Sequence, residues 1–326
     1  MTALSILNFG PGKLRMPSRL SQNFLPLNTA CRTTITRALH QHFFQADTHG
    51  ALATPEYLSS PEGQKDFNDH LHQRLDNFRR VVIPWLNDAM PLAGKRILEI
   101  GCGTGSSTVA LLEQNARVTA VDIDIPSLAV AKERCAAYGL KADFHRCNAT
   151  DVHEMFQNEK FDFVIFLASV EHMTHAERIS AMKTTWNMLP KGGMWAICET
   201  PNRLWCFDGH TSHLPFFHWL PDEFAFEYSR FSPRAPFNTS FRTLTPESML
   251  SFLREGRGVS YHEFNLAMPD AEVVNCLDEM NPLRNLLRRL RRTFNYRYEN
   301  FLAEVGPKIH RGFYKGSLDM VFRKSQ

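Results

Sequence analysis

The stretch Arg96-Ile-Leu-Glu-Ile-Gly-Cys-Gly-Thr-Gly105 decides the fold of this chain. A short aliphatic run leads into three glycines at alternate positions, and a helix-forming segment follows from Ser106. Glycine tolerates positive φ and has no side chain, so a ligand can approach the backbone closely at such a turn. The start of the next helix offers unpaired N–H groups and a positive dipole end, which suit a carboxylate. The stretch therefore predicts a strand, a ligand-binding loop and a helix.

Strands and helices alternate downstream of this unit. The predicted strands are 97–100, 117–121, 142–146, 161–167 and 193–198, with two further candidates at 259–266 and 318–322. The predicted helices between them are 106–114, 126–138 and 176–189, and Thr245-Pro-Glu-Ser248 carries the capping pattern of another helix. Such alternation with right-handed crossovers gives an α/β fold with a doubly wound, Rossmann-like sheet. We expect seven strands, one of them an antiparallel edge strand, and a ligand site at the carboxyl ends of the strands.

The spacing of the glycines separates two kinds of nucleotide-binding loop. In the dinucleotide fingerprint G-x-G-x-x-G the third glycine would fall at position 106, but Ser106 stands there and the third glycine comes earlier, at Gly105. Asp122 closes the second strand and can accept hydrogen bonds from both ribose hydroxyls. That carboxylate suits any adenosine cofactor, so an NAD-linked oxidoreductase stays an alternative.

Several motifs in order resemble those of class I S-adenosylmethionine-dependent methyltransferases, among them ubiquinone-pathway O-methyltransferases and sugar methyltransferases. The matching segments are Glu99-x-Gly101-x-Gly103-x-Gly105, Val121-Asp122, Phe161–Met173 with its Glu171-His172 pair, Leu189-Pro-Lys-Gly-Gly193 and Thr200-Pro-Asn-Arg203. In the fourth of these segments proline and lysine are transposed relative to the usual order. The resemblance covers roughly residues 65–268 and the last strand, and it implies S-adenosyl-L-methionine as the cofactor.

The resemblance also implies roles for the glycine loop and its neighbours. Gly101, Gly103 and Gly105 would admit the methionine half of the cofactor, and Glu99 would help to hold its ammonium group, directly or through water. Asp122 would bind the ribose hydroxyls.

Three further residues are expected at the cofactor. Ile123 would pack on the adenine, and Leu167 at the end of the fourth strand would line the methionine side. The family often has aspartate next to the adenine amine, where this chain has Asn148, whose amide oxygen can still accept that hydrogen bond.

A segment rich in aromatic residues follows the fifth predicted strand. Residues 205–241 hold eleven aromatic side chains, against 11% aromatic residues in the whole chain. We expect a mostly apolar acceptor cavity there, with His210 or His213 as general base; the alternative is a satellite core with surface histidines. His172, beside Glu171, is a second candidate base and equally a candidate structural residue.

The ends of the chain have unusual charge patterns. Residues 1–60 are expected to be a basic, poorly ordered arm, because residues 1–44 contain no acid and five basic residues. The alternative is a mitochondrial transit peptide. Residues 61–326 form the predicted methyltransferase domain, which carries an aromatic acceptor or lid insertion at 201–244 and a basic helical insertion at 267–316.

The basic insertion contains an amphipathic helix. Within 283–294 leucines recur at helical spacing and arginines fill much of the remaining surface. Such a helix can lie on an anionic membrane surface or bind an acidic partner, and otherwise its leucines pack on the domain.

Composition limits the remaining possibilities. Hydrophobic residues make up 43% and charged residues 22%, which excludes collagen, coiled coils and fully disordered chains. The seven cysteines are an odd number without a C-x-x-C pair, which favours a reducing, cytoplasmic compartment. A net charge of +3 is low, so no nucleic-acid partner is expected.

These observations predict an S-adenosylmethionine-dependent methyltransferase that acts on a hydroxyl of a small or lipid-like molecule. No metal is required for such a transfer. A non-catalytic protein that binds S-adenosylmethionine for regulation or assembly is the main alternative.

Overall fold

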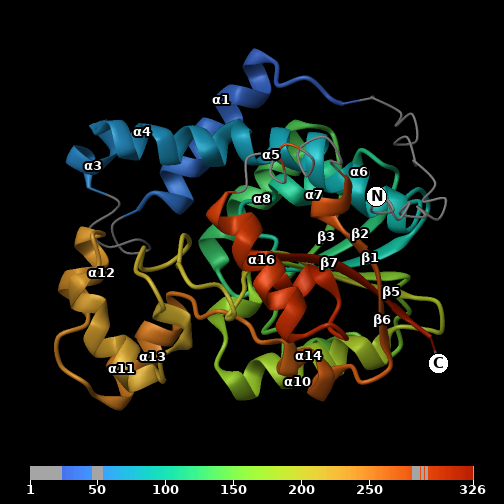
Figure 1. The fold of residues 1–326 in the computed structure, drawn as a ribbon. Helices are drawn as coiled ribbons and strands as arrows, with labels where there is room; N and C mark the ends of the chain where they lie inside the picture. The colour runs from blue at the N-terminus through green and yellow to red at the C-terminus, as the bar shows by residue number, and fades with distance from the viewer. Residues whose placement is uncertain (1–23, 46–53, 281–286, 288–289, 291–292, 326) are drawn as a thin grey trace.

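The sheet follows the predicted doubly wound plan (Figure 1). The computed structural model describes residues 24–45, 54–280, 287, 290 and 293–325. The strands are β1 (Arg96–Ile100), β2 (Arg117–Asp122), β3 (Asp143–Arg146), β4 (Phe163–Leu167), β5 (Met194–Pro201), β6 (Ala271–Cys276) and β7 (Ser317–Lys324). They lie in the order β3-β2-β1-β4-β5-β7-β6. Only β7 runs antiparallel to its neighbours, β5 and the edge strand β6. The predicted fold is therefore confirmed.

Helices cover both faces of the sheet. Before β1 lie α1 (Thr29–Ala38), η1 (Leu39–Phe43), α3 (Pro55–Ser59), α4 (Pro61–Asn68), η3 (Asp69–Gln73), α5 (Arg74–Asn77), η4 (Phe78–Val82) and α6 (Ile83–Ala89). From β1 to β5 the helices are α7 (Ser106–Leu112), α8 (Ile125–Ala137), α9 (Val152–Met155), η5 (Val170–His172) and α10 (His175–Met188). In Figure 1, α5, α7 and α8 lie on one side of the sheet, and α10 and α14 on the other.

A smaller helical lobe follows β5. Its elements are η6 (Phe217–Trp219), α11 (Asp222–Tyr228), η7 (Ser229–Phe231), α12 (Ala235–Ser240) and α13 (Pro246–Arg254). The remaining elements are α14 (Tyr261–Ala267), η8 (Leu277–Met280), α16 (Phe294–Val305) and η9 (Arg311–Tyr314).

Local capping explains where several helices begin. Asp124 accepts a hydrogen bond from the Ser127 N–H and so starts α8, and Thr174 with Glu177 forms a capping box at α10. The predicted cap of α13 is present, because the Thr245 side chain accepts from the Ser248 N–H.

One predicted strand is a helix. Residues 261–267 form α14, because Ser260 and Glu263 make a capping box that closes a helical turn. The missing strand is β6, which lies inside the predicted basic helical insertion 267–316. That insertion is therefore not wholly helical, and it supplies the edge of the sheet.

The predicted disordered arm also needs a correction. Residues 29–38 form α1, whose Ile35 and Ala38 are fully buried in the main core with Leu128 of α8. Asn28 caps this helix, and burial of its apolar face outweighs the lack of acid in its first turn. Residues 1–23 and 46–53 lie outside the described residues.

Most of the predicted amphipathic helix 283–294 also lies outside the described residues. Of its apolar stripe, Leu287, Leu290 and Phe294 are described, and all three side chains are exposed. Within the described ranges, no helix is both long enough and apolar enough to cross a bilayer.

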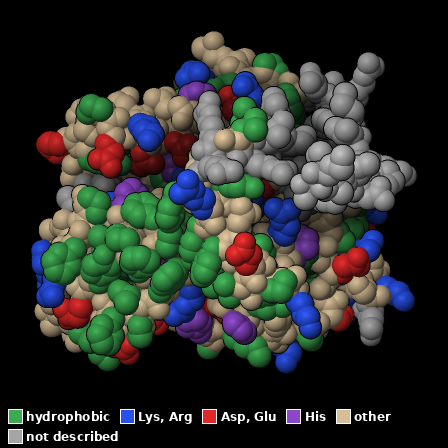
Figure 2. Space-filling view, viewed as in Figure 1, with side chains coloured by type: hydrophobic (Ala, Val, Ile, Leu, Met, Phe, Trp, Pro, Cys, Tyr) green, Lys and Arg blue, Asp and Glu red, His purple; other side chains and the backbone are tan. Residues whose placement is uncertain are grey.

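The aromatic segment divides between a core and a surface. Phe217, Phe226, Phe237 and Phe241 pack with Phe252 into a separate buried cluster within the helical lobe. Other large apolar side chains of this region are exposed, namely Phe207, Phe216, Trp219, Phe224 and Phe231. Figure 2 shows hydrophobic side chains gathered over the lobe that contains α11, α12 and α13. Part of the segment therefore forms the satellite core that was the alternative to a cavity.

The cysteines are buried thiols. All seven are free and buried. Burial raises the pKa of Cys135 to about 12 and that of Cys147 to about 11, and it raises the pKa of Cys102 well above its usual value. The reactive thiolate form is therefore disfavoured at these three positions near neutral pH.

Candidate active site

The glycine loop joins β1 to α7 at the carboxyl edge of the sheet. Gly101, Gly103 and Gly105 all have positive φ, at 79°, 50° and 80°. The N–H of Gly103 donates to Oδ2 of Asp122 over 2.8 Å, and the N–H of Asp124 donates to Oδ1 over 2.9 Å. The loop is thus held against the end of β2, where the ribose site is predicted.

The surroundings of the glycines differ. A Cβ at Gly105 would lie 2.8 Å from both Cα and Cβ of Ala131 in α8, so this position is closed by packing. A Cβ at Gly103 would meet nothing within 4 Å. The open space beside the loop therefore lies at Gly103, where a ligand can approach the backbone.

This difference makes a prediction for two alanine variants. Gly103→Ala and Gly105→Ala both place a side chain at positive φ, which costs about 1–3 kcal/mol. Gly105→Ala adds the clash with Ala131, so its free energy of unfolding falls further. Gly103→Ala places its methyl group in the open space, so it weakens binding of S-adenosylhomocysteine. Urea unfolding and calorimetric titration measure both effects, and equal destabilisation by the two variants would contradict the assignment.

Glu99 is fully buried in β1. The Thr108 hydroxyl donates to Oε2 over 2.7 Å, and the Ser107 hydroxyl donates to Oε1. Burial raises the pKa of Glu99 to about 7 despite these hydrogen bonds. In this structure the side chain ties α7 to β1, and its predicted contact with the cofactor ammonium stays a prediction.

Other residues at the loop fit an adenosyl amino acid. The Ser106 hydroxyl is buried and has no hydrogen-bond partner among the described residues, which leaves it available to a ligand carboxylate. Ile123 follows Asp122 and is 61% exposed, as a residue that packs on an adenine ring would be. These features fit the cofactor that the motifs predict.

The last two predicted cofactor residues lie on neighbouring strand ends. Asn148 follows β3 and is exposed, and its Oδ1 accepts from the Thr150 N–H over 3.2 Å. Leu167 ends β4 and is buried in the main core.

Two of the candidate histidines meet at one buried carboxylate. Oε1 of Glu171 lies 3.9 Å from Nε2 of His172 and 3.8 Å from Nε2 of His210. Oε2 of Glu171 accepts from the Thr200 hydroxyl at the end of β5 over 3.0 Å, while Oε1 has no hydrogen-bond partner within the described part of the chain. Glu171 is fully buried. The carboxylate thus faces both rings and is positioned by Thr200.

The two rings are held differently. Nδ1 of His172 donates to the carbonyl of Arg254 over 2.7 Å, because a carbonyl only accepts. His172 is therefore tied to the end of α13. Burial lowers the pKa of His210, although the nearby Glu171 carboxylate opposes this shift. His210 is therefore mostly neutral at pH 7, as a general base must be.

The other histidines of the lobe have different surroundings. His213 is exposed at φ 56°, and no ion pair joins it to the described part of the chain. His218 is buried, and its Nε2 lies 3.2 Å from Oδ1 of Asp208. Burial alone would raise the pKa of Asp208. The nearby His218 and the hydrogen bonds from the N–H groups of Ser212 and Thr211 instead hold this pKa below its usual range. The Asp208–His218 pair stabilises the loop that carries His210.

A cavity of about 260 Å³ opens beside His210. Its wall contains Trp205, Phe207 and His218, together with Glu199, Pro201 and Asn202 at the end of β5. Glu199, which the motifs did not single out, sits at φ 59° in an irregular part of the β5–β7 pairing and lines this cavity. Only its place directly after the predicted apolar strand 193–198 could have marked it in the sequence.

Comparison with known proteins identifies the class. Residues 97–193 match the family described as methyltransferase domain. This match spans less than a third of the chain and, with the relatives described next, supports a class I S-adenosylmethionine-dependent methyltransferase, whose cofactor is S-adenosylmethionine. The family and the cofactor that the motifs predict are thereby confirmed.

The relatives within this class match only part of the chain. The ubiquinone biosynthesis O-methyltransferase of Dechloromonas aromatica is 33% identical over 129 residues, which are 40% of this chain and 54% of that protein. The Ruegeria pomeroyi enzyme of the same name is 34% identical over 118 residues, 36% of this chain and 46% of that protein. The chain spans about half the length of the curated relatives it matches.

One solved structure with partial similarity is also a methyltransferase. The magnesium protoporphyrin IX methyltransferase of Synechocystis aligns with a TM-score of 0.43 and 15% identity, covering 67% of this chain and 81% of its own.

Proposed function

We propose that this protein transfers a methyl group from S-adenosylmethionine to an oxygen atom of a small or lipid-like acceptor, with His210 as the general base. The pairing of His210 with the buried Glu171 carboxylate beside a cavity carries the proposal. The names of the partial relatives, which are O-methyltransferases, also support oxygen as the acceptor atom.

The proposed chemistry divides between the cofactor and the chain. S-adenosylmethionine supplies a methyl group already activated on a sulfonium. Asp122 and the loop around Gly103 would hold the cofactor, and the cavity beside His210 would position the acceptor hydroxyl for the transfer. Nε2 of His210 would take the hydroxyl proton as the oxygen accepts the methyl group and S-adenosylhomocysteine is left. Glu171 stabilises the imidazolium that results.

The proposal is tested with isotope-labelled cofactor. The protein is incubated with methyl-labelled S-adenosylmethionine and a small-molecule extract, and mass spectrometry searches for labelled products. We expect a product with the label on an ether or ester oxygen, which is absent when His210→Ala is used. Label on nitrogen or carbon would contradict O-methylation, and cofactor binding without any labelled product would favour the non-catalytic alternative.

A pH titration tests the role given to Glu171. Asp208 also raises the pKa of His210, whereas His172 and His218 lower it, so Glu171→Gln removes one of two stabilising charges. We expect the pKa of His210 to fall further, and a base-dependent rate would then be lost at a lower pH than in the wild type. NMR of the His210 ring protons, assigned with His210→Ala, measures this shift without an acceptor. An unchanged or higher pKa would contradict the coupling.

A further inference from the structure

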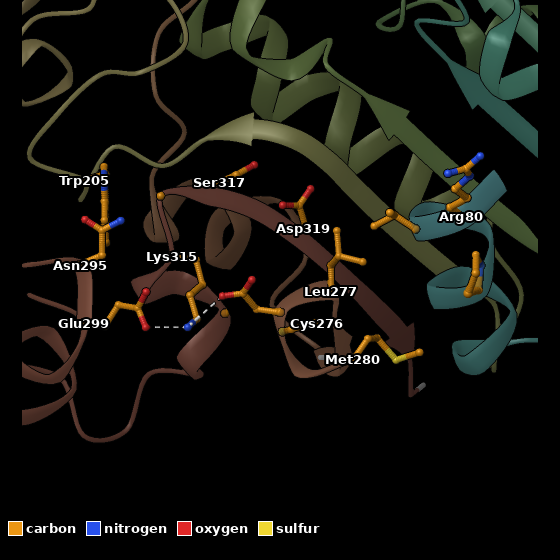
Figure 3. Close-up of a pocket in the computed structure, with 15 residues that line it drawn as sticks. Arg80, Trp205, Cys276, Leu277, Met280, Asn295, Glu299, Lys315, Ser317 and Asp319 are labelled. Carbon is orange, nitrogen blue, oxygen red and sulfur yellow. Dashed lines mark hydrogen bonds and ion pairs between the residues drawn. The ribbon is translucent and has the colours of Figure 1, made fainter. Parts of the chain in front are cut away.

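A second, larger cavity continues from the first along the carboxyl edge of the sheet. It has a volume of about 550 Å³ and lies between η4, β7, η8 and α16. Trp205, Gly316 and Ser317 line both cavities, so the two form one groove. Figure 3 shows Trp205 and Asn295 at one end of the larger cavity and Arg80 at the other. The groove therefore runs from His210 to the far edge of the sheet.

Trp205 forms the wall where the two cavities meet. A Cβ at Gly316 would lie 3.3 Å from atoms of the Trp205 indole, which is tighter than ordinary contact, so the ring packs closely on the residue that precedes β7. The Trp205 ring also meets Tyr298 edge-on, with the ring centroids 5.2 Å apart. The Tyr298 hydroxyl donates to the carbonyl of Leu204 over 2.7 Å. The junction is therefore a fixed part of the fold.

The charges of the larger cavity are mostly satisfied within it. Nζ of Lys315 lies 3.0 Å from Asp278 and 2.6 Å from Glu299, as the dashed lines in Figure 3 mark. The ammonium group is therefore neutralised by two carboxylates before any ligand binds. Arg80, at the far end, is the other cation in the lining.

Two carboxylates at the junction have no such partner. Oδ1 of Asp319 accepts the Glu199 N–H over 2.7 Å, and neither side chain forms an ion pair with a cation in the described residues. Asp319 lines the larger cavity and Glu199 the smaller one. Burial raises the pKa of both carboxyls; the charge of Asp319 raises that of Glu199 further, and the charge of Asp278 raises that of Asp319. The groove thus offers hydrogen-bond acceptors and excess negative charge.

This lining selects the chemistry of a ligand. Asp319 accepts the Glu199 N–H, and Glu199 accepts one hydrogen bond from the Asn77 side chain. An anionic group would be repelled by these carboxylates, and an apolar chain would cover their remaining acceptor sites without new hydrogen bonds, at a cost in desolvation. A neutral or cationic group with many O–H or N–H donors satisfies them. An aromatic wall with a few polar groups is also the usual composition of a small-molecule site.

We propose that the larger cavity is a subsite for a sugar ring of the acceptor, neutral or amino-substituted, while the methylated oxygen lies beside His210. The inference rests on the proposed function and narrows its acceptor to a glycoside or a glycosylated molecule. The sugar hydroxyls donate to Asp319 and Glu199, and Asn295 and Ser317 supply further hydrogen bonds at the wall.

Saturation-transfer NMR tests this subsite without an acceptor or turnover. The probes are methyl hexopyranosides, their 2-amino forms, their 6-phosphates and the matching uronates, each added to the full chain. We expect saturation transfer to the neutral and amino sugars and none to the two anionic sets. Stronger transfer to phosphates or uronates would place binding at Arg80 and overturn the proposal, as would no transfer to any probe.

Matched variants locate the signal. Asn295→Trp fills the cavity from α16, and Val81→Trp fills it from η4, so either one should abolish the transfer. Arg297→Trp on the exposed face of α16 lies outside the lining and should retain it. Transfer that persists in the two filling variants would overturn the assignment. Calorimetric titration with S-adenosylmethionine, unchanged in all three, separates a failure of this subsite from a failure of the cofactor site.

Discussion

Replacement of His210 by alanine should lower kcat for acceptor methylation by about 10²–10⁴-fold, the usual contribution of a general base. The Kd for S-adenosylmethionine should stay unchanged, because the glycine loop and Asp122 do not contact this side chain in the described hydrogen bonds. Single-turnover kinetics with the acceptor from the labelling experiment measures the rate, and calorimetry measures the cofactor affinity.

Two other histidine variants make this test specific. His153→Ala, an exposed residue of α9, is the matched control and should keep the full rate. His213→Ala tests the other base that the sequence suggests. A large loss in His213→Ala with none in His210→Ala would transfer the role to His213, and a loss of cofactor affinity in His210→Ala would indicate a structural role.

Asp122→Ala should weaken S-adenosylmethionine binding by about tenfold or more. Each charge-assisted hydrogen bond to a ribose hydroxyl is worth about 1.5–3 kcal/mol, and about 1.4 kcal/mol corresponds to tenfold in Kd. The carboxylate also accepts the N–H of Gly103, so its loss loosens the loop as well. Calorimetric titration measures the affinity, and thermal unfolding checks that the fold is intact.

A nearby acid provides the control for this variant. Asp151 is exposed after β3, and its side chain accepts only the Thr150 hydroxyl in the described hydrogen bonds. Asp151→Ala should therefore bind the cofactor as the wild type does. An unchanged Kd in Asp122→Ala would refute the ribose role of this residue.

The sequence predicts the central sheet well because its signals are local. The alternation of apolar strands with helices and the three glycines after β1 are readable within windows of a few residues. The helix at 261–267 was missed because its apolar residues also suit a strand. A capping box between Ser260 and Glu263 stabilises the first turn and so favours the helix. Helix α1 was missed because it is stabilised by packing on α8 rather than by its own composition. The two helices are far apart in the sequence; Cys31 and Ala137, for example, are hydrogen-bonded across 106 residues.

In the candidate site, too, local motifs could be predicted from the sequence and long-range contacts could not. The cofactor residues follow single strands and can be assigned from motifs, whereas the pairing of Glu171 with His210 joins segments on either side of β5. Asp319 and Glu199 are 120 residues apart and meet only through the β5–β7 register. Such contacts depend on tertiary structure, and no local pattern reports them.

The buried thiols have a consequence for work with this protein. Cys102 sits within the glycine loop, with its pKa raised by burial and by the nearby Glu99 and Asp122. Alkylating reagents reach such a sulfur only when the loop opens, so the rate of labelling there reports the frequency of opening rather than intrinsic nucleophilicity. The labelling rate of Cys102 is therefore a built-in measure of how often the glycine loop opens.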